Sequence, residues 1–221
     1  AGIPEACGSK ARTMGAYRFF HNPKVTMDVV LNAHKEATID RIKGHRIVLA
    51  PQDTTTLNYT THPMTGGLGP INNAKDAAIG LLLHDTLAFT EEGTPLGILD
   101  AQCWGRDPKD KGKRYRRYEL PSEQKESMKW LRSYRKVAEA QKLCPHTLLI
   151  SIGDRESDLY ELFVEAMKDP GGPGLLVRAE KSRKRKVEEQ FLWEVMSRRD
   201  VAGSLKIHVP RRGSRKARDT W

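Results

Sequence analysis

Two aspartates, Asp53 and Asp154, come at the end of apolar segments that have the length and composition of buried strands, 47–52 and 147–153. A buried strand fixes the direction of its last side chains, so an acid placed there can bind a cation in a defined geometry. The two aspartates are 101 residues apart in the sequence. Only strands that lie side by side in a sheet could bring them together, and the pattern therefore predicts a two-carboxylate metal site.

Each aspartate also has a purely structural interpretation. An Asp after a strand commonly forms a turn or caps a helix. Asp154 precedes a helical segment in which it could cap the amides of Ser157 and Asp158. The occurrence of two such acids in one topological frame favours the metal site.

Length and composition indicate a soluble globular chain: 221 residues with 38% hydrophobic content can form a core. No segment approaches the ~18 apolar residues of a membrane span, and the first residues are not a signal peptide. Cys7, Cys103 and Cys144 lack the spacing of a disulfide framework or a zinc module. We therefore expect a cytoplasmic protein and no membrane partner.

The positive charge is concentrated near the C-terminus. The net charge is +10 with a pI near 9.6, and residues 178–221 contain 14 Lys and Arg against 6 Asp and Glu. Such density is typical of chains that bind polyphosphate, although a solvated charge run or a linker is the alternative. Candidate DNA-binding residues are Arg178, Lys181, Arg183, Lys184, Arg211 and Arg212. A basic loop over 106–117, interleaved with Tyr115 and Tyr118, is a second candidate, with a mobile connection as the alternative.

Apolar periodicity and turn residues predict the elements that must position these side chains. We expect helices over 10–22, 26–43 and 122–143 and from 157, a polar loop over 54–70, and strands over 46–52, 77–90, 95–104, 147–152 and 174–179. From the first strand onward the order is β-β-β-α-β-α-β, that of the RNase H fold. In that fold the first and fourth strands are neighbours, and here they carry Asp53 and Asp154.

Four segments also resemble a known family. They are 16–22 (AYRFFHN), 52–59 (QDTTTLNY), 67–70 (GLGP) and 153–160 (GDRESDLY). In these segments the chain resembles the DDE transposases of bacterial insertion sequences, within the insertion-sequence-four family and its transposon-five-like branch. The resemblance runs over nearly the whole chain.

The resemblance implies roles for particular residues. Asp53 and Asp154 match the first two acids of the catalytic triad, and Arg155 and Arg178 match basic positions near the DNA. The implied cofactor is Mg²⁺ or Mn²⁺, because hard cations prefer carboxylate oxygens. The implied reaction is hydrolysis at the transposon end followed by strand transfer. The implied partners are double-stranded DNA, as transposon ends and target, and a second copy of the chain, forming a homodimer on DNA. The implied location is the bacterial cytoplasm, in association with the nucleoid.

The chain departs from the family pattern at the third acid. The family has this Glu on a late helix within a Tyr, Arg, Glu and Lys signature, and no such segment occurs here. Glu188, Glu189 or Glu194, on an expected helix, could substitute, but a solvent-facing acid is the commoner explanation. We therefore expect a transposase truncated before its third acid. A non-catalytic DNA-binding remnant and another RNase H-like DNA nuclease, such as a resolvase, are the alternatives.

The expected domains follow from this comparison. Residues 1–44 are expected to form the helical end of an N-terminal DNA-binding domain, with Arg12, Arg18, Lys24 and Lys35 as possible phosphate contacts. Residues 45–186 are expected to form an α/β, RNase H-like core with a mixed sheet. Residues 187–221, with a strand over 205–209, are expected to begin a β-rich insertion.

Overall fold

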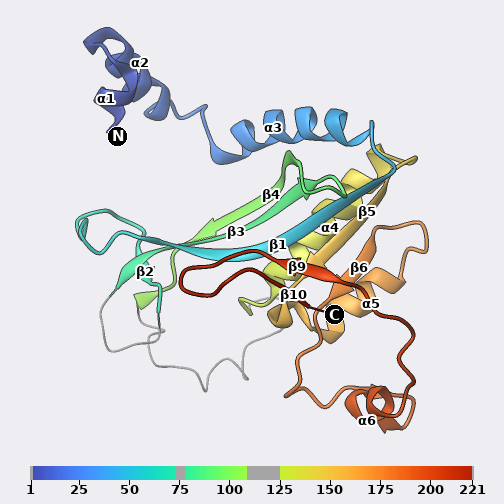
Figure 1. Cartoon of the computed structure of the whole chain (residues 1–221). Helices are drawn as coiled ribbons and strands as arrows, with labels where there is room; N and C mark the ends of the chain where they lie inside the picture. Colours follow the sequence, from blue (N-terminus) through green and yellow to red (C-terminus); the bar gives the residue numbers. More distant parts are fainter. Residues whose placement is uncertain (1, 73–77, 109–124, 221) are drawn as a thin grey trace. The chain divides into compact units, whose positions relative to one another are not determined.

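The computed structural model describes residues 2–72, 78–108 and 125–220. The chain divides into two compact units, Ala1–Ala179 and Glu180–Trp221, which we call the core unit and the C-terminal unit (Figure 1). Each unit is described separately. The domain boundaries expected after residues 44 and 186 remain predictions.

Three helices open the core unit: α1 (Ile3–Cys7), α2 (Lys10–Phe20) and α3 (Met27–Ile42). The α2 and α3 helices begin at capping residues, because Ser9 Oγ accepts the Arg12 amide and Thr26 Oγ1 accepts the Val29 amide, both at 3.3 Å. The predicted helices over 10–22 and 26–43 are thereby confirmed. The short α1, which ends at Gly8 in the left-handed conformation, was not expected.

Six strands of the described residues form one mixed sheet. They are β1 (Ile47–Asn58), β2 (Gly69–Pro70), β3 (Ile79–Phe89), β4 (Pro95–Trp104), β5 (Leu148–Gly153) and β6 (Gly174–Val177). Along the sheet the order is β2-β3-β1-β5-β6, with β4 also paired to β3. The β3 strand runs antiparallel to its neighbours β1 and β4. The β5 strand runs parallel to β1, and β6 runs parallel to β5. This α/β arrangement confirms the expected RNase H-like fold class.

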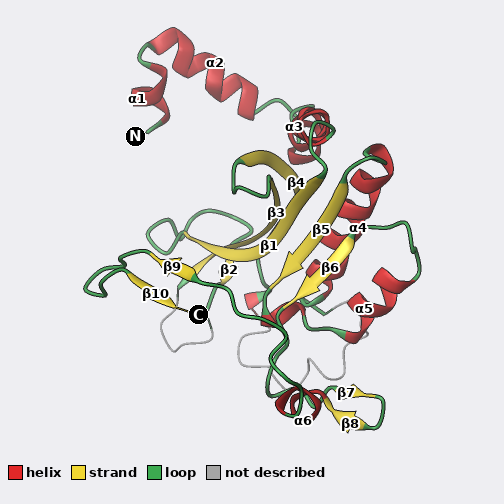
Figure 2. Cartoon of the chain, turned by 45° about the vertical axis from the view of Figure 1, so that its right-hand side comes forward, coloured by secondary structure: helices red, strands yellow, loops and turns green. Residues whose placement is uncertain are grey.

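The helices α4 (Met128–Leu143) and α5 (Tyr160–Met167) lie on one side of this sheet (Figure 2). Side chains alternate along β1, where Val48 and Ala50 are fully buried and Leu49 and Pro51 are only partly buried. The buried side faces the helices, since Val48, Ala50 and Leu149 belong to one core cluster with residues of α3 and α4. Each large apolar side chain buried there contributes about 1.5–3 kcal/mol.

A second cluster lies between α4, α5 and the sheet. It contains Trp130, Leu131, Tyr134 and Leu162, with Leu175 and Val177 packed against it. Tyr134 is buried as well, and its hydroxyl donates to the carbonyl of Pro173 at 3.0 Å. The cluster therefore fixes α4 against the segment that enters β6.

The first strand is longer than expected. Residues 54–58 were expected to belong to a polar loop, but β1 continues through Asp53 to Asn58. The reason is the ladder with β3, which pairs Asp53 with Asp85 and extends to Asn58 opposite Gly80. Threonine is β-branched and fits an extended, half-buried strand well. Asp53 consequently lies within a strand rather than at its end.

Other boundaries also differ from expectation. The α4 helix begins at Met128, and residues 122–124 of the predicted helix lie outside the described residues. A 3₁₀ turn, Arg155–Ser157, follows Asp154, and the α-helix begins only at Tyr160. The β6 strand ends at Val177, so Arg178 and Ala179 follow the strand.

The C-terminal unit consists of short elements. They are β7 (Lys186–Val187), β8 (Gln190–Phe191), α6 (Leu192–Ser197), β9 (Ile207–Val209) and β10 (Arg218–Thr220). Glu188 has a φ of 55° and lies with Glu189 in the turn between β7 and β8. The prediction of a helix at these two acids is therefore wrong. Glu194 lies in α6. None of the residues described in this unit is buried.

Candidate cation site and basic surfaces

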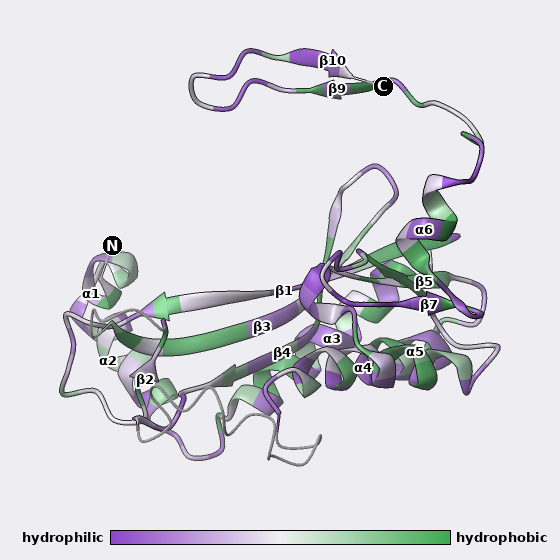
Figure 3. Cartoon of the chain, turned by 90° about the horizontal axis from the view of Figure 1, so that it is seen from below, coloured by the Kyte–Doolittle hydropathy of each residue, from purple (hydrophilic) through white to green (hydrophobic). Residues whose placement is uncertain are grey.

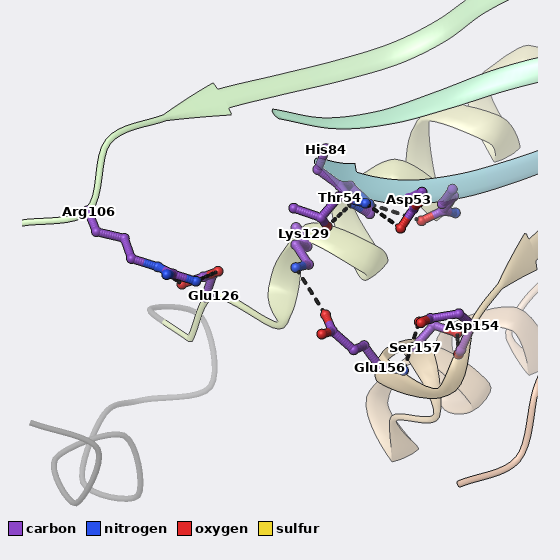
Figure 4. A network of polar contacts seen from close by, with 10 residues as sticks. Asp53, Thr54, His84, Arg106, Glu126, Lys129, Asp154, Glu156 and Ser157 are labelled. Atoms are coloured by element: carbon purple, nitrogen blue, oxygen red, sulfur yellow. Dashed lines mark hydrogen bonds and ion pairs between the residues drawn. The ribbon is translucent and has the colours of Figure 1, made fainter. Parts of the chain in front are cut away.

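The two predicted acids lie on neighbouring strands of the core unit. The β1 and β5 strands pair in parallel, from Ile47 opposite Leu148 to Pro51 opposite Ile152. This register has a constant offset of 101 residues, the same as the separation of Asp53 and Asp154. The ladder ends at the pair of Pro51 and Ile152 and β5 ends at Gly153, but the same offset continued by two residues would join Asp53 to Asp154. Figure 4 shows the two side chains on adjoining segments.

Both acids are open to solvent. Gln52 and Ser151 are buried on the helix-covered face, where Gln52 Nε2 donates to Ser151 Oγ at 2.8 Å. Because strand side chains alternate, Asp53 lies on the opposite face. Asp53 and Asp154 are both exposed, so a cation or a phosphate group can approach them from water.

A third aspartate, Asp85, is the direct cross-strand partner of Asp53 on β3. The pKa of Asp85 is raised, first by its partial burial and then by the negative charge of Asp53. Like charges directly opposite each other destabilise a sheet. A cation bound between β1 and its neighbours would relieve this repulsion.

The backbone fixes both carboxylates. Asp53 Oδ1 accepts the amide of Thr54 at 2.7 Å, and Asp154 Oδ1 accepts the amide of Glu156 at 2.8 Å. Asp154 therefore caps the 3₁₀ turn, as the structural interpretation suggested, but through Glu156 rather than through the expected amides of Ser157 and Asp158. Capping and cation binding are compatible, since a carboxylate has two oxygens and several lone pairs.

A polar layer lies under Asp53, between the sheet and α4. His84 is fully buried in it, 2.8 Å from Thr54 Oγ1 through Nδ1 and 3.4 Å from Gln52 Oε1 through Nε2. Burial, with the nearby charge of Lys129, lowers the pKa of His84 to about 4. The imidazole is therefore neutral at pH 7 and ties β3 to the residue that follows Asp53.

Sequence reasoning did not single out Asp85, His84 or Lys129. The first two have a signal in the sequence, because the segment His84-Asp85-Thr86 interrupts an otherwise apolar strand. Figure 3 shows the hydrophobic colour of β3 broken by a hydrophilic stretch. Lys129 carries no comparable signal, since its importance depends on contacts with a distant turn.

The predicted basic residues belong to both units. In the core unit, the Arg178 amide donates to the carbonyl of Gly153 at 3.1 Å, which holds Arg178 beside the start of the Asp154 turn. Arg155 follows Asp154 directly, and both arginines are exposed. Of the N-terminal candidates, Lys35 forms a 3.4 Å ion pair with Glu139 of α4.

The C-terminal unit carries the remaining predicted basic residues. Lys181 and Lys184 are exposed, and Arg183 is half-buried. Arg211 and Arg212 are exposed at the turn between β9 and β10, where Arg212 forms an isolated β-bridge with Arg215. These exposed cations can reach a polyanion without disturbing a core.

The second basic candidate, 106–117, is described only at its start. Arg106 forms a two-contact ion pair with Glu126, 2.9 Å from Nε to Oε2 and 2.7 Å from Nη2 to Oε1. This pair raises the pKa of Arg106. Residues 109–118, including the tyrosines, lie outside the described residues.

The two carboxylates are the candidate ligands of a divalent cation. Within the described ranges, no group of three or more His, Cys, Asp or Glu side chains is placed to hold a metal ion. Asp53 and Asp154 supply hard carboxylate oxygens from neighbouring strands, the ligand type that Mg²⁺ and Mn²⁺ prefer. The pair fits a partial site that leaves positions for water and phosphate oxygens.

Of the helices that the structure describes, none combines the length and the apolar content required to cross a bilayer.

The N-terminal segment has a counterpart among known families. Residues 1–25, which contain α1 and α2, match the family model described as Transposase DNA-binding. Three basic side chains of this segment, Lys10, Arg12 and Arg18, lie on α2 and are exposed. The match supports a transposase role for the chain, with DNA as its partner.

Proposed function

We propose that this chain acts as a DDE transposase of a bacterial insertion sequence, in the transposon-five-like branch of the insertion-sequence-four family. The proposal covers phosphodiester hydrolysis and strand transfer at transposon ends. It assigns Asp53 and Asp154 as the first two acids of the triad and leaves the third unassigned. It also includes a homodimer on DNA.

One observation carries the proposal. The register of β1 and β5 has the same 101-residue offset that separates Asp53 from Asp154. Strands paired with this offset would bring two motifs that are far apart in the sequence to one face of the RNase H-like sheet, which supports the proposal. The match of residues 1–25 to a transposase DNA-binding domain supports the same function independently.

The residues of the site have distinct parts in the proposed reaction. Asp53 and Asp154 would hold Mg²⁺ or Mn²⁺, which activates the attacking oxygen and stabilises the leaving oxygen in an in-line displacement. Arg155 and Arg178, near Asp154, would bind the flanking phosphates and keep the scissile bond at the acids. The polar layer around His84 holds β1 and β3 in register, so that Asp53 stays in place when DNA binds.

The basic residues outside the acid site would supply affinity without sequence preference. Lys181, Arg183, Lys184, Arg211 and Arg212 belong to the C-terminal unit, and phosphate contacts by such residues make binding strongly dependent on salt. Transposon-end sequence would be read elsewhere, with residues 1–25 the first candidate. This division follows the general rule that phosphate contacts position and base contacts specify.

The test combines DNA binding with strand nicking on a supercoiled plasmid, with Mg²⁺ or Mn²⁺ as the added metal. The unaltered chain is compared with Asp53→Asn and Asp154→Asn, which keep side-chain size and remove charge. We expect all three proteins to bind DNA, and any metal-dependent nicking by the unaltered chain to be lost in both variants.

Each other outcome has a defined meaning. Nicking that persists in both variants would contradict the assignment of the two acids. Binding without nicking by any of the three proteins would favour a non-catalytic DNA-binding protein. Nicking confined to branched DNA would favour a resolvase-like nuclease. Rapid turnover by the unaltered chain would show that the site does not need the family's third Glu.

A further inference from the structure

Two consecutive residues at the start of α4 contact the turn that carries Asp154. The Trp130 ring lies 3.4 Å from the position that a Cβ atom would occupy on Gly153. Lys129 Nζ lies 3.3 Å from Glu156 Oε2. Gly153 directly precedes Asp154 and Glu156 follows it by two residues, so α4 contacts the turn on both sides of the acid. Figure 4 shows the Lys129–Glu156 pair beside Asp154.

Lys129 is nearly enclosed by the protein. Its side chain is 7% exposed, whereas that of its partner Glu156 is 68% exposed. Lys129 Nζ also lies 5.7 Å from the centroid of the Trp130 ring, and the Lys129 carbonyl accepts Gln102 Nε2 at 3.0 Å. A lysine held on three sides has little freedom, because its long stem has already lost its rotamers.

Glu156 connects this lysine to the acid. Its side chain pairs with Lys129, and its backbone amide donates to Asp154 Oδ1 at 2.8 Å. Glu156 therefore contacts α4 through its side chain and the Asp154 carboxylate through its backbone amide. The path from Lys129 through Glu156 to Asp154 joins the helix-covered side of the sheet to the exposed site.

We propose that Lys129 is a positioning residue for Asp154, acting through Glu156 to hold the carboxylate in its cation-binding orientation. The inference rests on the proposed function, because it concerns the same site. Groups that orient metal ligands typically change metal affinity by about 10–100-fold when removed. Lys129 would belong to this class although it touches neither metal nor DNA.

The sign of one measurement separates positioning from simple charge. A lysine near two carboxylates repels a divalent cation, so if Lys129 acted only by charge, Lys129→Gln would tighten cation binding. If Lys129 positions Asp154, the same change weakens binding, by about tenfold. Mn²⁺ affinity, measured from the free Mn²⁺ signal in electron paramagnetic resonance, distinguishes the two.

The variants are chosen to separate folding from positioning. Lys129→Gln alters a buried residue, whereas Glu156→Gln alters an exposed side chain, keeps the backbone amide and breaks the same ion pair. Because both changes interrupt one path, we expect the double variant to bind Mn²⁺ no more weakly than the weaker single variant. Lys136→Gln is the matched control, since Lys136 is an exposed lysine of α4 that pairs with Glu139 at 2.9 Å.

A second readout needs no metal. The Glu156 amide is hydrogen-bonded to Asp154, so its hydrogen exchange reports on the turn itself. We expect Lys129→Gln and Glu156→Gln to lose protection at this amide, and Lys136→Gln to keep it. A structural defect of the whole unit would instead lower protection throughout the sheet.

The outcomes distinguish the inference from the proposed function. If the unaltered chain binds Mn²⁺ and Lys129→Gln leaves or tightens that affinity, the positioning role is overturned while the acid site stands. If the unaltered chain binds no Mn²⁺, the proposed function fails and the inference fails with it. In that case, loss of protection at the Glu156 amide would show only that the path from Lys129 through Glu156 to Asp154 has a structural role.

Discussion

The core unit and the C-terminal unit differ in how deeply their side chains are buried. In the core unit, the β1–β5 ladder and two buried clusters fix the backbone of β1, which contains Asp53, and of β5, which ends directly before Asp154. In the C-terminal unit, all described residues are at least partly exposed, including apolar ones such as Trp193 at 41% and Leu205 at 73%. The first unit fixes side-chain positions, whereas the second mainly presents positive charge.

This difference indicates which property each unit contributes. Cation binding needs carboxylates held at defined positions, and only a packed sheet provides them. Attraction to a polyanion needs charge density and tolerates loose placement. The two units should therefore respond differently to changes in packing, pH and salt.

The largest expected contrast comes from removing one tryptophan in each unit. Trp130 is 1% exposed within a core cluster, and Trp130→Ala should destabilise the core unit by about 3–5 kcal/mol. Trp193→Ala, at a 41% exposed position, should cost about 1 kcal/mol or less. Urea denaturation of the full chain measures both. Similar losses for the two variants would remove the distinction between a packed and an unpacked unit.

A smaller effect is expected from pH. His84 has a pKa of about 4 in the folded chain, below its ordinary value of 6.5. The unfolded chain therefore binds a proton at a higher pH than the folded chain does. Stability from neutral His84 is complete above that ordinary value and is lost as the pH falls toward the folded pKa. The loss between neutral pH and about pH 5 should be about 2 kcal/mol.

Denaturation of His84→Gln at both pH values isolates this contribution. Glutamine cannot titrate, so the variant should be less stable at neutral pH and lose less stability on acidification than the unaltered chain. An equal loss in both proteins would mean that other groups cause the acid sensitivity. His208 of the C-terminal unit contrasts with the buried His84, because His208 is exposed and pairs with Asp219 at 2.8 Å.

The smallest expected effect is on the salt dependence of DNA binding. Arg211→Gln and Arg212→Gln should each weaken duplex binding for all sequences alike, and should each reduce the slope of log affinity against log salt by about 1. Asp53→Asn should leave that slope unchanged or slightly strengthen binding. Fluorescence anisotropy over a range of salt concentrations measures this. An unchanged slope in both arginine variants would exclude them as phosphate contacts.

Much of the core unit could be predicted because local patterns and topology agree. The apolar run before Asp154 could form little else than a buried strand, and the order of elements made the strands of Asp53 and Asp154 neighbours. The β3–β4 hairpin followed from a short turn at Gly93 between two apolar runs. These features depend on sequence-local signals, which a single chain displays directly.

What could not be predicted depends on tertiary pairing. The extension of β1 to Asn58 requires β3 as a partner, because Thr-rich segments fit a loop equally well until a ladder forms. The place of Asp85 opposite Asp53 depends on the register of strands joined by a long connection. The contact of Lys129 with Glu156 spans 27 residues and arises only when α4 packs on the sheet.

The central claim is that Asp53 and Asp154 share one divalent cation, and bound Fe²⁺ can test it directly. With ascorbate and peroxide, Fe²⁺ generates hydroxyl radicals that cut the polypeptide next to its binding site, and mass spectrometry locates the cuts. The account predicts cuts beside both Asp53 and Asp154, with both sets lost in Asp53→Asn and in Asp154→Asn. Cuts at only one of the two strands, or cuts that persist in both variants, would contradict it.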